Sequence, residues 1–312
     1  MCDPVISGGA AIAGAALINS EAAEPVRNYI VDLYDALNVM MPEPQPYGSF
    51  HLTAISIVLV LTVLLSYLLR NASPRLMRFV IAGFWLVMIV SELLDQFVVC
   101  TTVVDGVLVF DYSWGRFPYQ LCATGLWILP LIFLLPECRG RDWMMVYMGL
   151  YSFFGGLLVC VVPTTVFSEL LIINLHTMIQ HGSQVIFGVM MLVYNRRKLS
   201  IRSFLGASLI FLILVAIAVG ANEVFYHLLR AFGDDAKFNM FYISPYFNSG
   251  MPVFSVVFEL VPWGVFLAMY IVGFALIAFL IYFIAILSIH VAEGIRYKRM
   301  SKAEAEEKPE AL

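Results

Sequence analysis

Charge is scarce in this sequence. Only 13% of its 312 residues are Asp, Glu, Lys or Arg, and 61% are hydrophobic, whereas soluble domains average about a quarter charged and about half apolar. This composition excludes an ordinary water-soluble domain and predicts an integral membrane protein. No basic surface that would favour a nucleic-acid partner is present.

The five cysteines lack the paired spacing of metal sites. Cys2, Cys100, Cys122, Cys138 and Cys160 form no CxxC or CxxxC pattern, so neither a zinc site nor a cluster is expected, and no metal or cofactor is predicted. Cys100 and Cys122 flank one outer hairpin and can form a disulfide in an oxidising compartment. The sequence therefore leaves open whether Cys122 is a reactive thiol, a packed thiol or half of a disulfide.

Lysine is absent from the last apolar stretch, "WGVFLAMYIVGFALIAFLIYFIAILS" (263–288). A retinal photoreceptor needs a lysine there for its Schiff base, so this class of sensor is excluded, and a retinal-free seven-helix sensor remains open. The sequence also lacks an internal repeat and a matched pair of Gly- or Pro-broken helices, which are typical of secondary transporters.

Long apolar stretches dominate what is present. Seven of them can cross about 30 Å of hydrocarbon, and they cover residues 51–70, 77–98, 118–136, 143–163, 169–194, 203–228 and 262–289. We therefore predict an all-α, polytopic membrane fold with seven transmembrane helices.

Lysine and arginine are distributed unequally between the loops on the two sides. Basic loops stay cytoplasmic, and 14 of the 18 Lys and Arg residues lie on one side of the seven spans. The other four are Arg27, Arg116, Arg230 and Lys237. We therefore predict that the N-terminus is outside and the C-terminus is cytoplasmic.

Three parts of the chain are expected. Residues 1–47 form an extracytoplasmic N-terminal segment, in which residues 26–41 have the apolar face of an interfacial amphipathic helix. Residues 48–290 form the seven-helix membrane domain. Residues 291–312 form a charged cytoplasmic tail.

Polar residues gather in the outer half of the expected bundle. Each span rises by about 1.5 Å per residue from its cytoplasmic arginine, which puts Glu92, Cys122, His181 and Asn222 about 21 to 30 Å above that arginine. A polar group that faces lipid at such a depth costs several kcal/mol. These side chains are therefore expected to face the bundle interior.

The stretch "IINLHTMIQHGSQVIFG" (172–188) is the most polar of the spans. A helical wheel puts Thr177, Gln180, His181 and Gln184 within an arc of about 100°. Intramembrane Gln and Thr often only join helices, whereas an ionisable group at the depth of His181 is a functional candidate. The opposite arc is expected to face lipid and consists of Leu171, Ile172, Leu175, Met178, Ile179, Val185, Ile186, Val189 and Met190.

Three stretches share a pattern with a known family. "FPYQLCATGLWILPL" (117–131) opens a span with Leu-Cys, "IQHGSQVIFG" (179–188) has a mid-span His-Gly, and "GANEVFYHLL" (220–229) precedes "NMFYISPYFNSGMP" and "FELVPWGVF". Their order and spacing resemble the YwaF-like integral membrane family, and His51 matches a histidine that begins the first span of such proteins. The vertebrate relatives of that family include a membrane acyltransferase that remodels ether phospholipids.

This resemblance implies an acyl-enzyme mechanism with Cys122 as the nucleophile and His181 as the base. A cysteine nucleophile needs a nearby base or positive charge. His181 is the deep histidine whose height above the cytoplasmic arginines is similar to that of Cys122. Asn222 or Gln184 would stabilise the oxyanion, while Glu92 or Glu223 would orient the imidazole.

The expected function is therefore a lipid acyltransferase with an acyl-cysteine intermediate, in the outer-leaflet half of a multi-pass protein of the cell membrane. Its partner would be membrane lipid. The alternative is a small-molecule transporter or substrate-capture protein that uses the same polar pocket, with Glu92 and His181 as a proton-coupled pair. The sequence gives no indication of the acyl donor, the acceptor or the oligomeric state.

Overall fold

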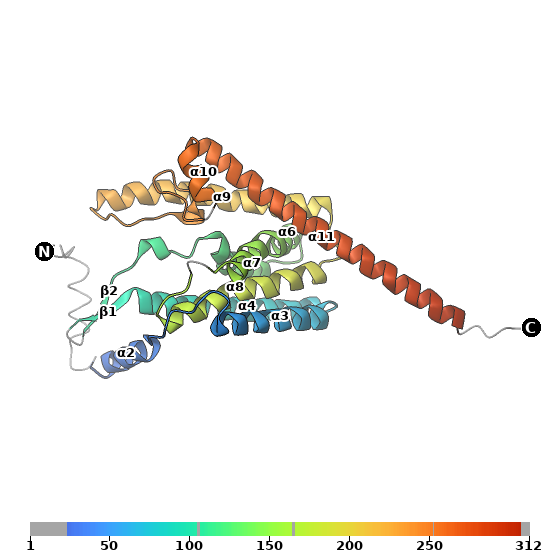
Figure 1. The fold of residues 1–312 in the computed structure, drawn as a ribbon, viewed down its shortest axis with the longest axis horizontal. Helices are drawn as coiled ribbons and strands as arrows, with labels where there is room; N and C mark the ends of the chain where they lie inside the picture. The colour runs from blue at the N-terminus through green and yellow to red at the C-terminus, as the bar shows by residue number, and fades with distance from the viewer. Residues whose placement is uncertain (1–23, 105–106, 164–165, 252, 307–312) are drawn as a thin grey trace, which may run out of the picture.

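The computed structural model describes residues 24–104, 107–163, 166–251 and 253–306. Within these ranges the chain is a bundle of long helices with its loops gathered at the two ends (Figure 1). The beginning of the expected N-terminal segment (1–23) and the end of the expected tail lie outside the described residues.

Five helical runs in the described ranges are long and apolar enough to cross a membrane. Local sequence explains where two of them start: Ser73 caps α4 by accepting a hydrogen bond from the Leu76 amide at 3.2 Å, and Ser200 forms a capping box with Ser203 at the start of α9. The five runs are α3 (Ser49–Leu69), α4 (Pro74–Val99), α6 to α7 (Arg139–Val161), α9 (Ile201–Ala231) and the apolar part of α11 (Trp263–Glu306).

Two further expected spans are helical but do not meet those criteria. The third is short, because the backbone is extended at Phe117, as a following proline favours. It begins as a 3₁₀ turn, η3 (Leu121–Ala123), and continues as α5 (Gly125–Leu134). The fifth, α8 (Leu171–Tyr194), carries the polar stretch. The number of seven spans and their orientation thus stay predictions.

The chain is mostly helical, in agreement with the predicted all-α class, and a small hairpin at one end of the bundle was not predicted. Strands β1 (Thr101–Val104) and β2 (Val107–Phe110) form an antiparallel hairpin in which Thr101 pairs with Phe110. The fourth span also contains a π-helical turn, η4 (Met148–Ser152), between α6 (Arg139–Tyr147) and α7 (Phe153–Val161). Such π-bulges are frequent at functional sites.

Helix α8 is the centre of the bundle, where it packs against α3, α4, α7 and η4 (Figure 1). Glycines allow this close approach: a Cβ on Gly182 would meet the Val58 side chain at 2.5 Å. The expectation that one arc of α8 faces lipid holds only in part: Leu175 and Ile179 are exposed, but neighbouring helices cover most of the rest. Five members of that arc are buried, namely Ile172, Met178, Val185, Ile186 and Met190.

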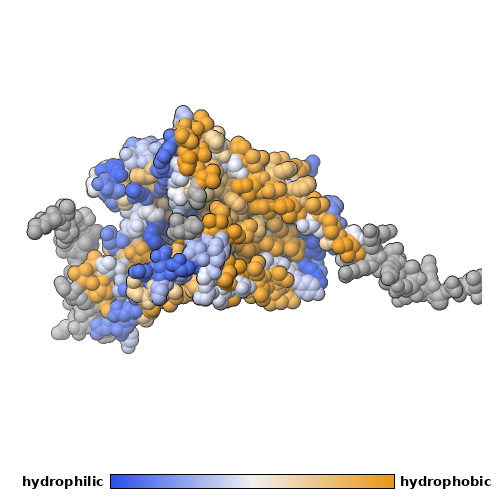
Figure 2. Space-filling view, viewed as in Figure 1, coloured by the Kyte–Doolittle hydropathy of each residue, from blue (hydrophilic) through white to orange (hydrophobic). Residues whose placement is uncertain are grey.

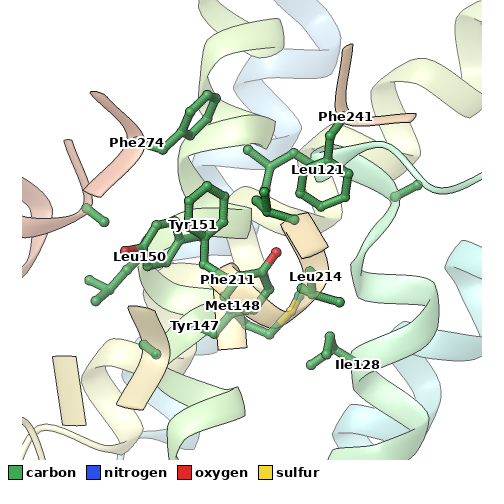
Figure 3. Packing of buried hydrophobic residues seen from close by; sticks show 14 of the residues in the cluster. Leu121, Ile128, Tyr147, Met148, Leu150, Tyr151, Phe211, Leu214, Phe241 and Phe274 are labelled. Carbon is green, nitrogen blue, oxygen red and sulfur yellow. The ribbon is translucent and has the colours of Figure 1, made fainter. Parts of the chain in front are cut away.

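The main hydrophobic core joins the third and fourth spans to α9, α11 and the loop before α10 (Phe254–Leu260). Tyr151 stacks on Phe211 with ring centroids 4.5 Å apart. Phe241, from the 3₁₀ turn η5 (Met240–Tyr242), is fully buried beside Leu121 (Figure 3). The loop between α9 and α10 is therefore part of the bundle interior.

The outer surface has a broad apolar belt between two more hydrophilic ends (Figure 2). Helix α2 (Glu24–Leu37) lies at the hairpin end and packs Tyr34 against Phe97, with ring centroids 6.2 Å apart. A helix was expected at this position. The predicted tail begins as a direct helical continuation of α11 to Glu306.

Candidate functional site

Cys122 lies in the 3₁₀ turn that opens the third span. It is a free thiol, as are Cys100, Cys138 and Cys160, so the possible disulfide between Cys100 and Cys122 is not formed in the structure. A free thiol retains the chemistry that a disulfide would remove.

Gln184 ties this turn to α8. Its side-chain Nε2 donates a hydrogen bond to the carbonyl oxygen of Cys122. The amide is fully buried, and its Oε1 has no hydrogen-bond partner in the described part of the chain. His181 lies three residues earlier on α8, so Gln184 and His181 share one face of the helix.

His181 is held in one tautomer by its own helix. Its ring Nδ1 lies 2.8 Å from the carbonyl oxygen of Thr177, and a contact with a carbonyl requires a proton on that nitrogen. In a neutral imidazole Nε2 then carries the lone pair. The side chain is thus oriented by the Thr177 carbonyl and offers an acceptor nitrogen.

Helices α7 and α8 make a tight contact on the face of α8 that carries His181 and Gln184. A Cβ added to Gly156 would meet the carbonyl oxygen of His181 at 2.6 Å and the Cβ of Gln184 at 2.7 Å. Gly155 lies beside the Cys122 backbone, since its Cβ would be 3.8 Å from the Cα of Cys122. The two glycines therefore let the Cys122 turn, α7 and α8 meet.

Tyrosine hydroxyls surround the other side of the Cys122 turn. Tyr147 donates to the hydroxyl of Thr124 at 2.9 Å, and Thr124 donates to the carbonyl of Leu121 at 2.7 Å. Tyr270, from α11, is fully buried, and its hydroxyl has no partner among the described residues. A buried hydroxyl without a partner is costly and requires an explanation.

Asn222 is fully buried and holds the inserted loop. Its Nδ2 donates to the carbonyl of Met240 at 3.0 Å, and its Oδ1 accepts from the amide of Met240 at 2.7 Å. The next two residues, Phe241 and Tyr242, have positive φ angles of 56° and 57°. Such strain in bulky residues is tolerated only where the surroundings impose it.

A charged cluster lies on α4 and α8 toward the hairpin end. The Oε2 of Glu92 is 3.0 Å from Nε2 of His176, and Oδ2 of Asp95 is 2.7 Å from a guanidinium nitrogen of Arg116. Gln96 donates to Oε1 of Glu92 and to the carbonyl of Arg116, each at 2.8 Å. The cluster joins two helices to the 3₁₀ turn η2 (Trp114–Arg116).

The TMEM164 family model matches residues 46–286, which is most of the chain. The chain belongs to the TMEM164 family. No curated protein and no solved structure matched it. The matched region of this TMEM164 family chain runs from just before α3 into α11 and contains every candidate residue described above. With its family membership and the five apolar helices long enough to cross a membrane, the chain is a multi-pass membrane protein.

Within the TMEM164 family region, two candidates lie apart from Cys122. His51 is fully buried at the start of α3, where its Nδ1 accepts from the amide of Tyr47 at 2.9 Å and its Nε2 lies 3.0 Å from the carbonyl of Cys160. Its Nε2 therefore joins α3 to α7, while its Nδ1 holds the segment that leads into α3. Glu223 is exposed and binds Tyr246 and His227 rather than His181.

Sequence reasoning missed the partners of Glu92. Neither His176 nor Arg116 was predicted to contact the carboxylate of Glu92. One signal was available: Arg116 is among only four basic residues on the predicted outer side, and it lies near two intramembrane carboxylates, those of Glu92 and Asp95. The tyrosines Tyr147 and Tyr270 were missed because aromatic residues in apolar spans carry no functional signal.

Proposed function

We propose that this TMEM164 family protein is an acyltransferase that moves acyl groups between lipids through an acyl-cysteine intermediate on Cys122. One observation carries the proposal: Gln184 binds the backbone carbonyl of Cys122, a residue with a free thiol, and so joins this turn to the helix face that His181 shares. The site lies inside a multi-pass bundle, so its substrates are lipids of the cell membrane, drawn from the leaflet at the hairpin end.

The reaction takes two balanced steps. In the first, His181 Nε2 accepts the thiol proton, Sγ of Cys122 attacks the ester carbonyl of a donor lipid, and the proton passes to the leaving alkoxide, which departs as a lysolipid. In the second, the acceptor hydroxyl gives its proton to His181 and attacks the thioester. The acyl group leaves Cys122, whose sulfur regains a proton from His181.

The oxyanion of each tetrahedral intermediate needs a hydrogen-bond donor. The donors expected from sequence have other partners, since the amide of Asn222 binds Met240 and that of Gln184 binds the carbonyl of Cys122. Tyr270 is a better candidate because its hydroxyl is fully buried in the bundle interior and has no hydrogen-bond partner in the described chain. Removal of one such donor costs about 10²-fold to 10³-fold in kcat.

Acyl transfer in vesicles that contain labelled phospholipid tests the proposal. We expect Cys122→Ala and His181→Ala each to abolish transfer. Matched controls exist: Cys160→Ala removes another buried thiol, and His290→Ala removes an exposed histidine whose Nδ1 binds the carbonyl four residues earlier, as in His181. Both controls should retain activity and remain folded.

The intermediate can be measured directly. The protein incubated with donor lipid should carry an acyl adduct on the peptide that contains Cys122, and neutral hydroxylamine should release it because thioesters are labile to this nucleophile. Transfer at the normal rate by Cys122→Ala would exclude the covalent mechanism. Tyr270→Phe should slow transfer without preventing the adduct.

Transport is the second candidate, and the pair of Glu92 and His176 favours it, because intramembrane carboxylates and histidines form proton relays in transporters. The sequence had paired Glu92 with His181 for this role. Uptake of a solute into proteoliposomes that depends on Glu92 and survives Cys122→Ala would support transport over acyl transfer.

A further inference from the structure

A groove of about 770 Å³ opens between α8 and α11 at the end of the bundle away from the hairpin. Its volume is within the ~300–1,000 Å³ typical of ligand pockets. It contains neither Cys122 nor His181, so it is separate from the candidate site. Its lining includes Arg70, Arg196, Arg197, Ile281, Ala285 and Glu293.

The walls of the groove are apolar along most of its length. From Ile281 to Glu293 the α11 wall rises by about 18 Å at 1.5 Å per residue. One leaflet of hydrocarbon is about half of the ~30 Å bilayer core. The groove is therefore about as long as one leaflet is thick, which fits an extended acyl chain.

Positive charge collects at one end of these walls. Arg70, Arg196 and Arg197 contribute to the lining, with Glu293 as the single acidic member. No carboxylate in the described residues forms an ion pair with any of the three arginines. The rim therefore carries a net positive charge that its own side chains do not neutralise.

Hydrogen bonds to neutral groups fix the central arginine. The guanidinium of Arg196 donates to the carbonyl of Arg70 and to Oδ1 of Asn71, each at 2.6 Å. This holds the turn between α3 and α4 against the end of α8. The turn that carries Arg70 and the helix end that carries Arg196 and Arg197 are thus held together at this rim of the groove.

We propose that this groove binds an anionic phospholipid, with an acyl chain along the α8 and α11 walls and its phosphate at Arg70, Arg196 and Arg197. Arginine suits this ligand because its planar fork matches phosphate oxygens. Basic pockets between transmembrane helices recognise anionic headgroups. The lipid would join α11 to α8 along a stretch where protein side chains leave space.

The test compares lipid binding to the purified full-length protein by native mass spectrometry in detergent. Phosphatidylglycerol should bind more tightly than phosphatidylcholine, and inorganic phosphate alone should bind weakly. Arg197→Gln should weaken phosphatidylglycerol binding by about fivefold, which corresponds to the ~1 kcal/mol expected per basic residue near an anionic lipid. Arg202→Gln removes a basic residue from the same end but outside the groove, so it should leave binding unchanged.

A second variant tests the acyl-chain half of the groove. Ala285→Trp fills the wall and should reduce the binding of both phospholipids while it leaves the arginines in place. Equal binding of the two lipids, an equal loss in Arg202→Gln, or inorganic phosphate that competes fully with phosphatidylglycerol would overturn the proposal. So would a dimer that Ala285→Trp dissociates, because a second copy of the chain would then occupy the groove.

Discussion

Two Glu–His pairs in this protein have the same geometry and opposite surroundings. The Nε2 of His176 is 3.0 Å from a carboxylate oxygen of Glu92, and the Nε2 of His227 is 3.0 Å from one of Glu223. In the first pair the histidine and glutamate side chains are 16% and 7% exposed, and in the second they are 65% and 53% exposed.

The surroundings decide how much each pair contributes to the stability of the protein. Water screens the exposed pair of Glu223 and His227, which lies within one helix, and such pairs contribute about 0–1 kcal/mol. The buried pair of Glu92 and His176 joins α4 to α8 where water is scarce. Loss of one partner therefore leaves a polar group of the other buried with a weaker hydrogen-bonding or ionic environment. Equal distances therefore give no measure of energy, and burial shows which pair holds the bundle together.

Glu92→Ala should have the largest effect on stability. It removes the nearer of the two carboxylates beside His176, the other being Asp95 at 3.7 Å, and one acceptor of Gln96. A broken buried pair costs about 3 kcal/mol or more. The free energy of unfolding in detergent, measured by titration with a denaturing detergent, gives the value. A double-mutant cycle with His176→Ala should give a coupling energy above about 1 kcal/mol, and a coupling near zero would show that the pair contributes little.

Asn222→Ala should have the next largest effect. Two buried groups of the Met240 backbone would lose their partners, at about 1–3 kcal/mol for a buried polar group left unsatisfied. Hydrogen exchange should become faster at residues 238–243, while α3 and α4 remain protected. The neighbouring Glu223→Ala is the matched control on the same helix, and equal exchange in both variants would contradict the assignment.

Helix positions could be predicted because they depend on local properties. Long apolar runs predicted the five helices that are long and apolar enough to cross a membrane. The period of 3.6 residues identified the buried polar face that contains Gln180, His181 and Gln184. The hairpin was also predictable, since "TTVVDGVLVF" (101–110) has β-branched runs around an Asp-Gly pair. We predicted only helices, although this hairpin signal is present in the sequence.

Partner choice could not be predicted in the same way. Counting residues gives the depth of a side chain but not the rotation of one helix against another, so it could not tell whether Glu92 faces His176 or His181. The apolar arc of α8 looked lipid-facing because amphipathic reasoning assumes one fully exposed side, whereas neighbouring helices bury five of the nine residues in this arc. The contacts of Gln184 with Cys122 and of Asn222 with Met240 are likewise set by tertiary packing.

Glu223→Gln should have the smallest effect, and it tests the exposed side of the comparison. The Tyr246 hydroxyl donates to Glu223 at 2.9 Å, and this hydrogen bond raises the pKa of Tyr246 above its ordinary value. A raised pKa contributes stability that is complete below the ordinary tyrosine pKa and is lost as the pH rises through the higher value. At neutral pH the variant should therefore lose only a small part of its free energy of unfolding, because water screens exposed groups. Salt should reduce the difference, and alkaline pH should remove it. A loss as large as that of Glu92→Ala would mean that the pair is buried in the membrane-bound protein, and that burial in the isolated chain does not separate the two Glu–His pairs.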